Sequence, residues 1–215
     1  LTNQFIGVNK MNIYFLRHGQ SIGNLTNDYG TSFHGHLSEK GLMQAEALVE
    51  RLKGIKFDHI FVSPIERAVY TILPYLKANN IIAELWGELS EACYQKSREG
   101  ELPENVRYGH AIKIAEDDMR FFKYRDNDAH RAFPPSPENY LEGIRRIRWI
   151  YEHLIDNYGK SNLSILLVGH AHAGSRLIEM FLDMEPIGSI QIDNTGLSKI
   201  SYSTEGIKVA FLNRK

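Results

Sequence analysis

The chain contains a single cysteine, Cys93, among its 215 residues. One thiol excludes an internal disulfide and a zinc site built from several cysteines, and it is typical of a reducing compartment such as the cytoplasm. No apolar run reaches the roughly 20 residues that a membrane-spanning helix needs. Charges of the two signs nearly cancel, with 25 Lys and Arg against 26 Asp and Glu, so no global field attracts nucleic acid or an anionic membrane. Any anion site must therefore be local.

The length and the 43% hydrophobic content allow one sizeable core, so we expect a single domain over residues 11–215. Residues 1–10 precede Met11, a natural start, and we interpret them as a tag remnant or an N-terminal extension. The segment from about 95 to 135 has charge clusters and prolines but too few apolar residues for a core of its own. We expect it to be an inserted excursion that acts as a lid and sets substrate choice. The sequence indicates no oligomeric state.

One stretch near the start delivers an arginine and a histidine to the end of a buried strand. Residues 13–16 are apolar and β-forming, and they stop at Arg17-His18-Gly19. In open α/β sheets, ligands bind at the carboxyl ends of the strands, so Arg17 and His18 are well placed for an anion. From this stretch alone, the alternative that His18 is a solvated or hydrogen-bonded residue stays open.

A second histidine follows another buried strand in the same manner. Residues 164–168 form the clearest strand pattern in the chain, and Gly169-His170 comes directly after them. If the sheet is parallel at its centre, both imidazoles lie at one edge. The sequence thus predicts that His18 and His170 converge, although they are far apart in the chain.

An arginine is expected near the same edge. Residues 58–62 form a strand pattern that ends at Ser63-Pro64 and leads into a helix over 65–77, with Arg67 in its first turn. Helix amino ends favour anions, and an arginine there adds a bidentate phosphate donor. Taken alone, Arg67 fits a surface residue paired with Glu66 or Glu84 better than a phosphate ligand.

The remaining pattern predicts a three-layer α/β fold, with a mainly parallel sheet and helices on both faces. The other expected elements are a helix from a Ser38 cap to Gly54, a strand over 81–86, a helix from a Ser136 cap to about Tyr158, a helix that follows residues 169–174 and runs to about Leu182, and late strands over 194–202 and 207–212. In the second of these helices, Arg145, Arg146 and Arg148 are interpreted as a solvated face.

Two histidines, two arginines and a nearby carboxylate leave two chemical interpretations. A metal site is one, because His18, His170, His172 and a glutamate are possible ligands. The arginines argue against it, since their charge opposes a cation and neutralises a phosphate. The chain has neither a serine elbow nor a Walker-type loop. The favoured chemistry is therefore phosphoryl transfer to a histidine nitrogen, with an acid that protonates the leaving oxygen.

At this point the sequence resembles the histidine phosphatase superfamily, which includes cofactor-dependent phosphoglycerate mutases and many phosphatases. The matching pieces occur in the family's order: Leu16-Arg17-His18-Gly19-Gln20-Ser21-x-x-Asn24, Leu37-Ser38-x-x-Gly41-x-x-Gln44-Ala45, Ser63-Pro64-x-x-Arg67-Ala68-x-x-Thr71, Leu89-Ser90-Glu91, Val168-Gly169-His170 and the polar turn Asn194-Thr195-Gly196. Together they cover most of the chain and are far more specific than any one piece.

The resemblance implies roles for individual residues. His18 is the nucleophile that becomes phosphohistidine, Arg17, Arg67 and His170 hold the phosphoryl oxygens, and Asn24 lines the pocket. The family needs no metal, and no cofactor is implied. The expected function is hydrolysis of a small phosphorylated metabolite.

The same resemblance makes Glu91 the proton donor, because it occupies the glutamate of the family's Leu-x-Glu pattern. Glu88 is the nearby competitor. If the third strand extended this far, alternation would point the two side chains in opposite directions, so we expect only Glu91 in the pocket.

The sequence also departs from the family pattern. Ala171 replaces the usual glycine after the second histidine, His172 adds an imidazole, and Tyr94-Gln95-Lys96 stands where many phosphatases have Gly-x-Trp-Glu-Gly. Two alternatives to a phosphatase stay open: a phosphoglycerate-type mutase, and a phospho-ligand-binding protein without turnover. The presence of both His18 and Glu91 favours an enzyme, since a binder needs neither.

Overall fold

In a computed structural model, the structure describes residues 9–27, 35–93, 110–111, 114–125, 132–133 and 138–215. The elements, in chain order, are β1 (Met11–Arg17), α1 (Ile22–Thr26), α2 (Glu39–Arg51), β2 (His59–Val62), α3 (Glu66–Asn79), β3 (Ala83–Leu85), a 3₁₀ turn (Gly87–Leu89), β4 (His110–Ala111), α4 (Glu116–Met119), β5 (Phe122–Tyr124), β6 (Ala132–Phe133), α5 (Tyr140–Tyr158), β7 (Ser164–Gly169), α6 (Ala171–Phe181), β8 (Leu197–Ser203) and β9 (Gly206–Arg214).

Seven of the strands form one sheet in the order β5-β3-β2-β7-β1-β8-β9. The pairs β1–β7, β2–β7, β2–β3 and β3–β5 are parallel, whereas β8 and β9 join the sheet antiparallel. The central strand β1 pairs with β7 so that Arg17 lies opposite Gly169. The carboxyl ends of these two strands therefore coincide, as the sequence predicted.

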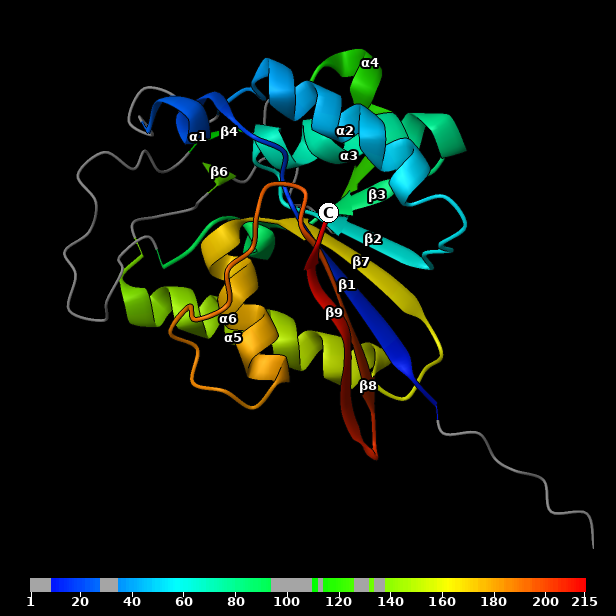
Figure 1. Cartoon of the computed structure of the whole chain (residues 1–215), viewed down its shortest axis with the longest axis vertical. Coiled ribbons are helices and arrows are strands. Elements are labelled where there is room, and N and C mark those ends of the chain that lie inside the picture. The colour runs from blue at the N-terminus through cyan, green and yellow to red at the C-terminus, as the bar shows by residue number, and fades with distance from the viewer. Residues whose placement is uncertain (1–8, 28–34, 94–109, 112–113, 126–131, 134–137) are drawn as a thin grey trace, which may run out of the picture.

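Helices cover both faces of the sheet, which confirms the three-layer α/β fold (Figure 1). α2 and α3 pack on one face, over an apolar core that includes Leu16, Leu48 and Ile72. α5 and α6 cover the other face, where Phe15 and Leu167 lie in a second core. The central strands are buried on both sides, which explains their continuous apolar runs.

Several helix ends follow from single residues. Ser38 caps α2 by accepting from the backbone N–H of Gly41, as expected. The expected cap of α5 was wrong in position: the N-cap is Asn139, and its side chain forms a capping box with Glu142. Ser136 lies outside the described residues. The late strand β8 also starts later than expected, because Asn194 and Thr195 form a turn.

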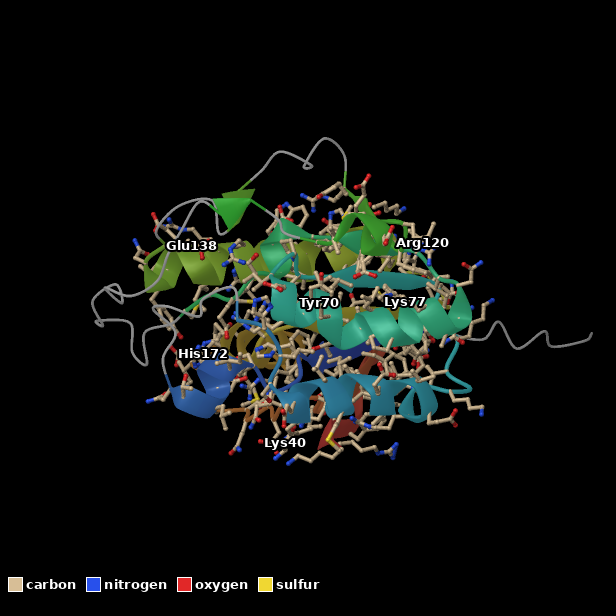
Figure 2. All side chains as sticks on the ribbon, turned by 90° about the horizontal axis from the view of Figure 1, so that it is seen from above. Lys40, Tyr70, Lys77, Arg120, Glu138 and His172 are labelled. Carbon is tan, nitrogen blue, oxygen red and sulfur yellow. The ribbon has the colours of Figure 1, made fainter. Side chains whose placement is uncertain are left out.

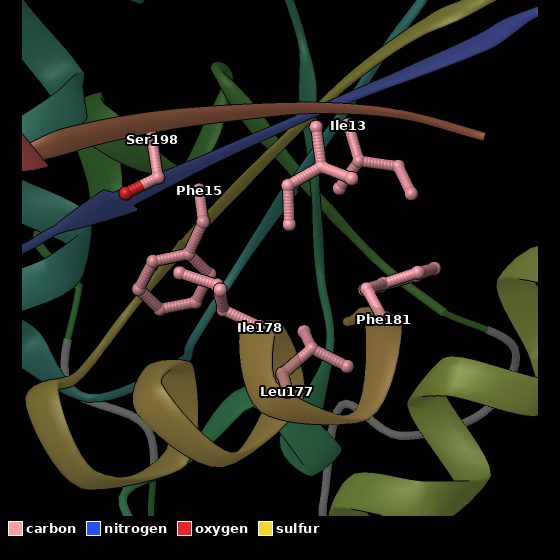
Figure 3. A pocket seen from close by; sticks show the side chains of 7 residues that line it. Ile13, Phe15, Leu177, Ile178, Phe181 and Ser198 are labelled. Atoms are coloured by element: carbon pink, nitrogen blue, oxygen red, sulfur yellow. The ribbon is translucent and has the colours of Figure 1, made fainter. Parts of the chain in front are cut away.

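The core contains a small cavity of about 10 Å³ between α6 and the strands β1 and β8 (Figure 3). Its lining is apolar apart from Ser198, whose oxygen accepts from the backbone of Asn213. A space this small and apolar is a packing gap and not a ligand site.

The described helices include none that is both long and apolar enough to cross a membrane. Much of the predicted excursion from 95 to 135 lies outside the described residues, as do residues 1–8. Its lid role, the extension at 1–10 and the single-domain boundary therefore stay predictions. Within the excursion, β5 is described, and it extends the main sheet at the edge next to β3.

Candidate active site

His18 lies directly after β1, and its two hydrogen-bond partners fix its tautomer. Nδ1 is 2.7 Å from the carbonyl oxygen of Gly19, which can only accept, so Nδ1 carries the proton. Nε2 lies 3.2 Å from Nε of Arg67, which can only donate. The lone pair is therefore on Nε2, where it accepts the hydrogen bond from Arg67.

The surroundings of His18 also keep its ring uncharged. The residue is 3% exposed. Burial, followed by the positive charges of Arg67 and Arg17, holds the pKa of His18 well below its ordinary value of 6.5. Nε2 is therefore available for bond formation at neutral pH.

The loop after His18 is fixed against the helices on one face of the sheet. The backbone N–H of Gly19 donates to Oγ1 of Thr71 at 2.7 Å, and that of Gln20 donates to the side chain of Gln44. A Cβ at Gly41 would lie 2.0 Å from the carbonyl oxygen of Gln20, so only glycine permits this close approach. These contacts immobilise the peptide whose carbonyl orients His18.

His170 occupies the N-cap position of α6, and its ring centroid lies 5.1 Å from that of His18. Its Nε2 is 2.8 Å from Oγ of Ser63, which also accepts from the backbone N–H of Ile65. Ser63 can donate its own proton to Nε2, and in that tautomer the ring hydrogen of His170 lies on Nδ1. That atom is buried and has no hydrogen-bond partner among the described residues. A buried N–H of this kind suits an anionic oxygen.

The two arginines act on both imidazoles. Burial, then the charge of Arg67, lowers the pKa of His170 well below its ordinary value, and Arg17 adds to the effect. Nη1 of Arg17 donates to the carbonyl oxygen of Ile192 at 2.7 Å. Arg67 is 5% exposed and contacts His18, so the alternative of a surface residue is wrong. The predicted convergence of these four side chains is present.

Glu91 lies against the first turn of α6, just beyond His170. Its Oε1 accepts from the backbone N–H groups of Ala173 at 2.9 Å and Ala92 at 3.2 Å, and its Oε2 accepts from that of His172 at 3.3 Å. The carboxylate thus takes the place of a helix cap, since His170 provides no side-chain cap. Only Oε2 keeps a lone pair that no backbone N–H occupies.

Glu88 does not share this position. It lies in the 3₁₀ turn, and its Oε1 accepts from Nη2 of Arg125 at 2.8 Å. Strand β3 ends at Leu85, so the alternation of side chains along a strand does not extend to Glu88 and is not what separates the two glutamates. The two carboxylates are nevertheless separate, because Glu88 binds Arg125 and Glu91 binds the start of α6. The additional imidazole, His172, is half-exposed, and its Nδ1 lies 3.7 Å from Oε2 of Glu91.

Asn24 is part of a polar link between the start and the end of the chain. Its Oδ1 accepts from Nδ2 of Asn194 at 3.1 Å, and the same Nδ2 contacts the carbonyl oxygen of His18. Asn194 was not singled out from the sequence as a site residue, although it belongs to the polar turn that resembles the family pattern. Its signal was a polar residue directly before a late strand.

Among the residues that the structure describes, no three His, Cys, Asp or Glu side chains gather as a metal site. His172, one possible ligand, contacts the carboxylate of Glu91. Figure 2 places His172 at the opposite end of the molecule from Lys77 and Arg120.

Known proteins resemble the chain over nearly its whole length. The sequence profile of the histidine phosphatase superfamily (branch 1) matches residues 13–215. Adenosylcobalamin/alpha-ribazole phosphatase of Escherichia coli is 23% identical over 207 residues, which are 95% of this chain and 97% of that enzyme. A 2,3-bisphosphoglycerate-dependent phosphoglycerate mutase of Brucella melitensis is 27% identical over 194 residues, or 86% and 88% of the two chains.

Solved structures share the fold. Alpha-ribazole phosphatase from Shigella flexneri has a TM-score of 0.68 at 21% identity, with 95% of this chain and 96% of that one covered. A mycobacterial glucosyl-3-phosphoglycerate phosphatase in complex with VO3 has a TM-score of 0.67 at 16% identity, with 95% and 99% covered.

The chain belongs to the histidine phosphatase superfamily. Within that class it is a phosphatase, and the predicted function, hydrolysis of a phosphomonoester through a phosphohistidine, is confirmed at the level of the family.

Proposed function

We propose that His18 is the nucleophile and Glu91 the general acid in hydrolysis of a small phosphorylated metabolite. The observation that carries the proposal is the tautomer of His18, whose Nε2 lone pair faces Arg67 while Nδ1 is bound to a carbonyl. A nucleophilic histidine needs this arrangement, because one nitrogen attacks while the other keeps its proton.

In the first step, the Nε2 lone pair of His18 attacks phosphorus. The N–P bond forms as the P–O ester bond breaks, and the proton on Glu91 moves to the leaving oxygen to give an alcohol. Arg17, Arg67 and Nδ1–H of His170 donate to the phosphoryl oxygens and stabilise their charge. Asn24 lines the pocket next to them.

In the second step, the Glu91 carboxylate takes a proton from water as the water oxygen attacks phosphorus. The N–P bond breaks, its electron pair returns to Nε2, and inorganic phosphate leaves. Oε2 is the oxygen that carries the proton, since both lone pairs of Oε1 are engaged by backbone N–H groups.

Hydrolysis is favoured over a mutase reaction, although the relatives include both kinds of enzyme. A mutase must bind a second phosphate group, which requires free basic side chains near the site. In the described part of the excursion, Arg125 is paired with Glu88 at 2.8 Å and Lys123 with Glu84 at 3.1 Å, while Arg120 lies over the ring of Phe121. This pairing supports the phosphatase.

We also propose that the enzyme acts in a reducing compartment such as the cytoplasm, on a free small molecule and not on nucleic acid or a membrane. The free thiol of Cys93 and the net charge near zero support this proposal. Fractionation of cells that express the tagged chain tests the location, and recovery with the membranes would contradict it.

The direct test combines trapping with a substrate screen. Rapid acid-free quenching after incubation with a phosphomonoester should yield an alkali-stable, acid-labile phosphoenzyme. His18→Ala should abolish both this species and turnover, whereas His36→Ala, an exposed histidine, should retain them. The screen should include sugar phosphates, phosphoglycerates, alpha-ribazole phosphate and an aryl phosphate, with and without chelator.

Two results would change the proposal. A His18→Ala protein with near-normal turnover would refute the nucleophile. Interconversion of phosphoglycerate isomers that outpaces release of inorganic phosphate would show a mutase instead of a hydrolase.

A further inference from the structure

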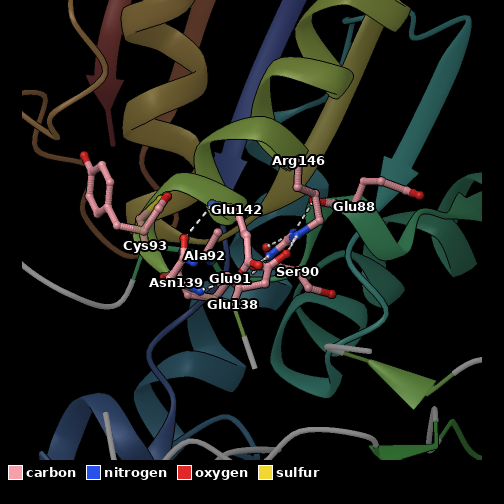
Figure 4. Close-up of polar contacts among 10 residues, drawn as sticks. Glu88, Ser90, Glu91, Ala92, Cys93, Glu138, Asn139, Glu142 and Arg146 are labelled. Atoms are coloured by element: carbon pink, nitrogen blue, oxygen red, sulfur yellow. Dashed lines mark hydrogen bonds and ion pairs between the residues drawn. The ribbon is translucent and has the colours of Figure 1, made fainter. Parts of the chain in front are cut away.

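The long helix α5 has three arginines close together, and one of them differs from the others. Arg145 and Arg148 are exposed, as the sequence indicated. The expectation of a solvated face was wrong for Arg146, whose side chain is only 11% exposed. It points toward the segment that carries Glu91 (Figure 4).

α5 lies directly on that segment. A Cβ at Gly143 would lie 2.9 Å from Sγ of Cys93 and 3.3 Å from Cβ of Ala92, so a larger residue would push the helix away. Gly143 and Arg146 are three residues apart and share a helix face. The contact therefore allows the guanidinium of Arg146 to reach the backbone around Glu91.

All five N–H donors of Arg146 have an acceptor, and three of these acceptors are backbone carbonyls of the acid's segment. Nη1 donates to the carbonyl oxygens of Glu88 at 2.5 Å and Ser90 at 2.8 Å, and Nη2 donates to that of Glu91 at 3.0 Å. Beyond the 3₁₀ turn, the residues from Ser90 to Cys93 belong to no helix or strand. Arg146 supplies the backbone contacts that a sheet would otherwise provide.

The two remaining donors bind Glu138. Nε and Nη2 of Arg146 lie 2.6 Å and 2.7 Å from the two carboxylate oxygens, in a bidentate pair. Glu138 neutralises a guanidinium that would otherwise be buried at high cost. Glu138 follows the excursion from about 95 to 135, and Glu91 precedes it, so one guanidinium binds the chain on both sides of that segment.

We propose that Arg146, oriented by Glu138, is a positioning residue for the general acid. The inference rests on the proposed role of Glu91. Arg146 holds the backbone of Glu91 through its carbonyl, while the first turn of α6 holds the carboxylate. The acid is thereby fixed at both ends, and loosening one end should misplace the proton relative to the leaving oxygen.

The test compares two leaving groups. An alkyl phosphate needs its leaving oxygen protonated, whereas p-nitrophenyl phosphate releases a stable phenolate. Arg146→Lys should reduce kcat/KM about tenfold for the alkyl ester and about twofold or less for the aryl ester, because a small displacement of a catalytic group impairs proton transfer selectively. Inhibition by vanadate should be unchanged, since the phosphate-binding groups are untouched.

Matched controls come from the same helix. Arg145→Lys and Arg148→Lys make the same chemical change at exposed positions and should leave both substrates unaffected. Glu138→Gln keeps Arg146 but removes the bidentate ion pair, so it should give the same selective loss in weaker form. If Arg146→Lys does not fold, Glu138→Gln tests the positioning role of Arg146 in its place.

The outcomes separate the two proposals. Equal loss on both esters, or weaker vanadate inhibition, would show that Arg146 is only structural. Selective loss in Glu91→Gln without any in Arg146→Lys or Glu138→Gln would overturn the positioning role and leave the general acid intact. No selectivity in Glu91→Gln would overturn both. In the double variant that combines Glu91→Gln with Arg146→Lys, we expect no further selective loss beyond that of Glu91→Gln alone.

Discussion

The His18 side of the site and the Glu91 side are built in different ways. His18 follows a central strand, and the carbonyl that orients it belongs to the next residue, Gly19. Glu91 follows a short 3₁₀ turn, and its contacts come from Arg146 and Ala173, far along the chain. One side is therefore fixed at the ends of the strands and against α2 and α3 on one face of the sheet, and the other by α5 and α6 on the opposite face.

This difference also divides the chemistry. In the proposed mechanism, the histidines and arginines at the ends of β1 and β7 and at the start of α3 surround the phosphoryl group, which every phosphomonoester shares. The Glu91 side then acts on the leaving oxygen, which differs between substrates. Changes on the first side should therefore affect all substrates alike, and changes on the second should distinguish them.

Among the variants that test this division between the two sides of the site, Glu91→Gln should give the largest change in kcat/KM. Loss of a general acid should lower kcat/KM for an alkyl phosphate by roughly 10²- to 10⁴-fold, with a much smaller loss for an aryl phosphate. Steady-state rates on the two esters measure it. Glu88→Gln is the matched control, because Glu88 is paired with Arg125 away from the site. Selective loss in the control, or equal loss on both esters in Glu91→Gln, would mean that the acid is misassigned.

On the other side, Arg67→Ala should weaken binding of vanadate or phosphate by roughly 10- to 100-fold, because a charge-assisted contact is worth about 1.5–3 kcal/mol. The inhibition constant reports this loss, and the rates on alkyl and aryl esters should fall together. Lys77→Ala removes the same charge from the distant end of α3 and should change neither quantity (Figure 2). A leaving-group preference in Arg67→Ala would break the division.

A smaller effect concerns stability at acid pH. The folded protein holds the pKa of His18 below its ordinary value, so below about pH 6.5 the unfolded chain binds a proton that the folded chain excludes. The free energy of unfolding should thus fall as the pH drops, by up to about 1.4 kcal/mol per pH unit for this group. His18→Asn should make that slope shallower in phosphate-free urea titrations from pH 7 to 5. An unchanged slope in His18→Asn would contradict the buried, neutral ring.

The division also explains what the sequence could predict. The positions of His18 and His170 follow from apolar strands that end at a histidine, a pattern contained in a few consecutive residues. Parallel pairing of β1 and β7 then brings the two rings together without any further information. The fold class and most elements were predicted for the same reason.

The surroundings of the acid were not predictable in this way. Arg146 looks in sequence like its exposed neighbours Arg145 and Arg148, and only the packing of α5 on the segment after β3 distinguishes it. On the His18 side, the contact between Asn194 and His18 was not predictable either, because it joins residues that are far apart in the chain. Interactions of this kind depend on tertiary structure and leave no local pattern.

The position of β8 beside β1 has a consequence for synthesis on the ribosome. The backbone N–H of Arg17 donates to the carbonyl oxygen of Gly196, and that of Thr195 donates to the carbonyl oxygen of Arg17, so the loop that carries His18 is completed by residues translated long after it. A nascent chain that has reached only α6 already contains both histidines, but it lacks Ile192 to anchor Arg17. Pairing across such long sequence separations is slow to form. The end of the sheet that carries His18 therefore becomes complete only after the turn before β8 has been translated.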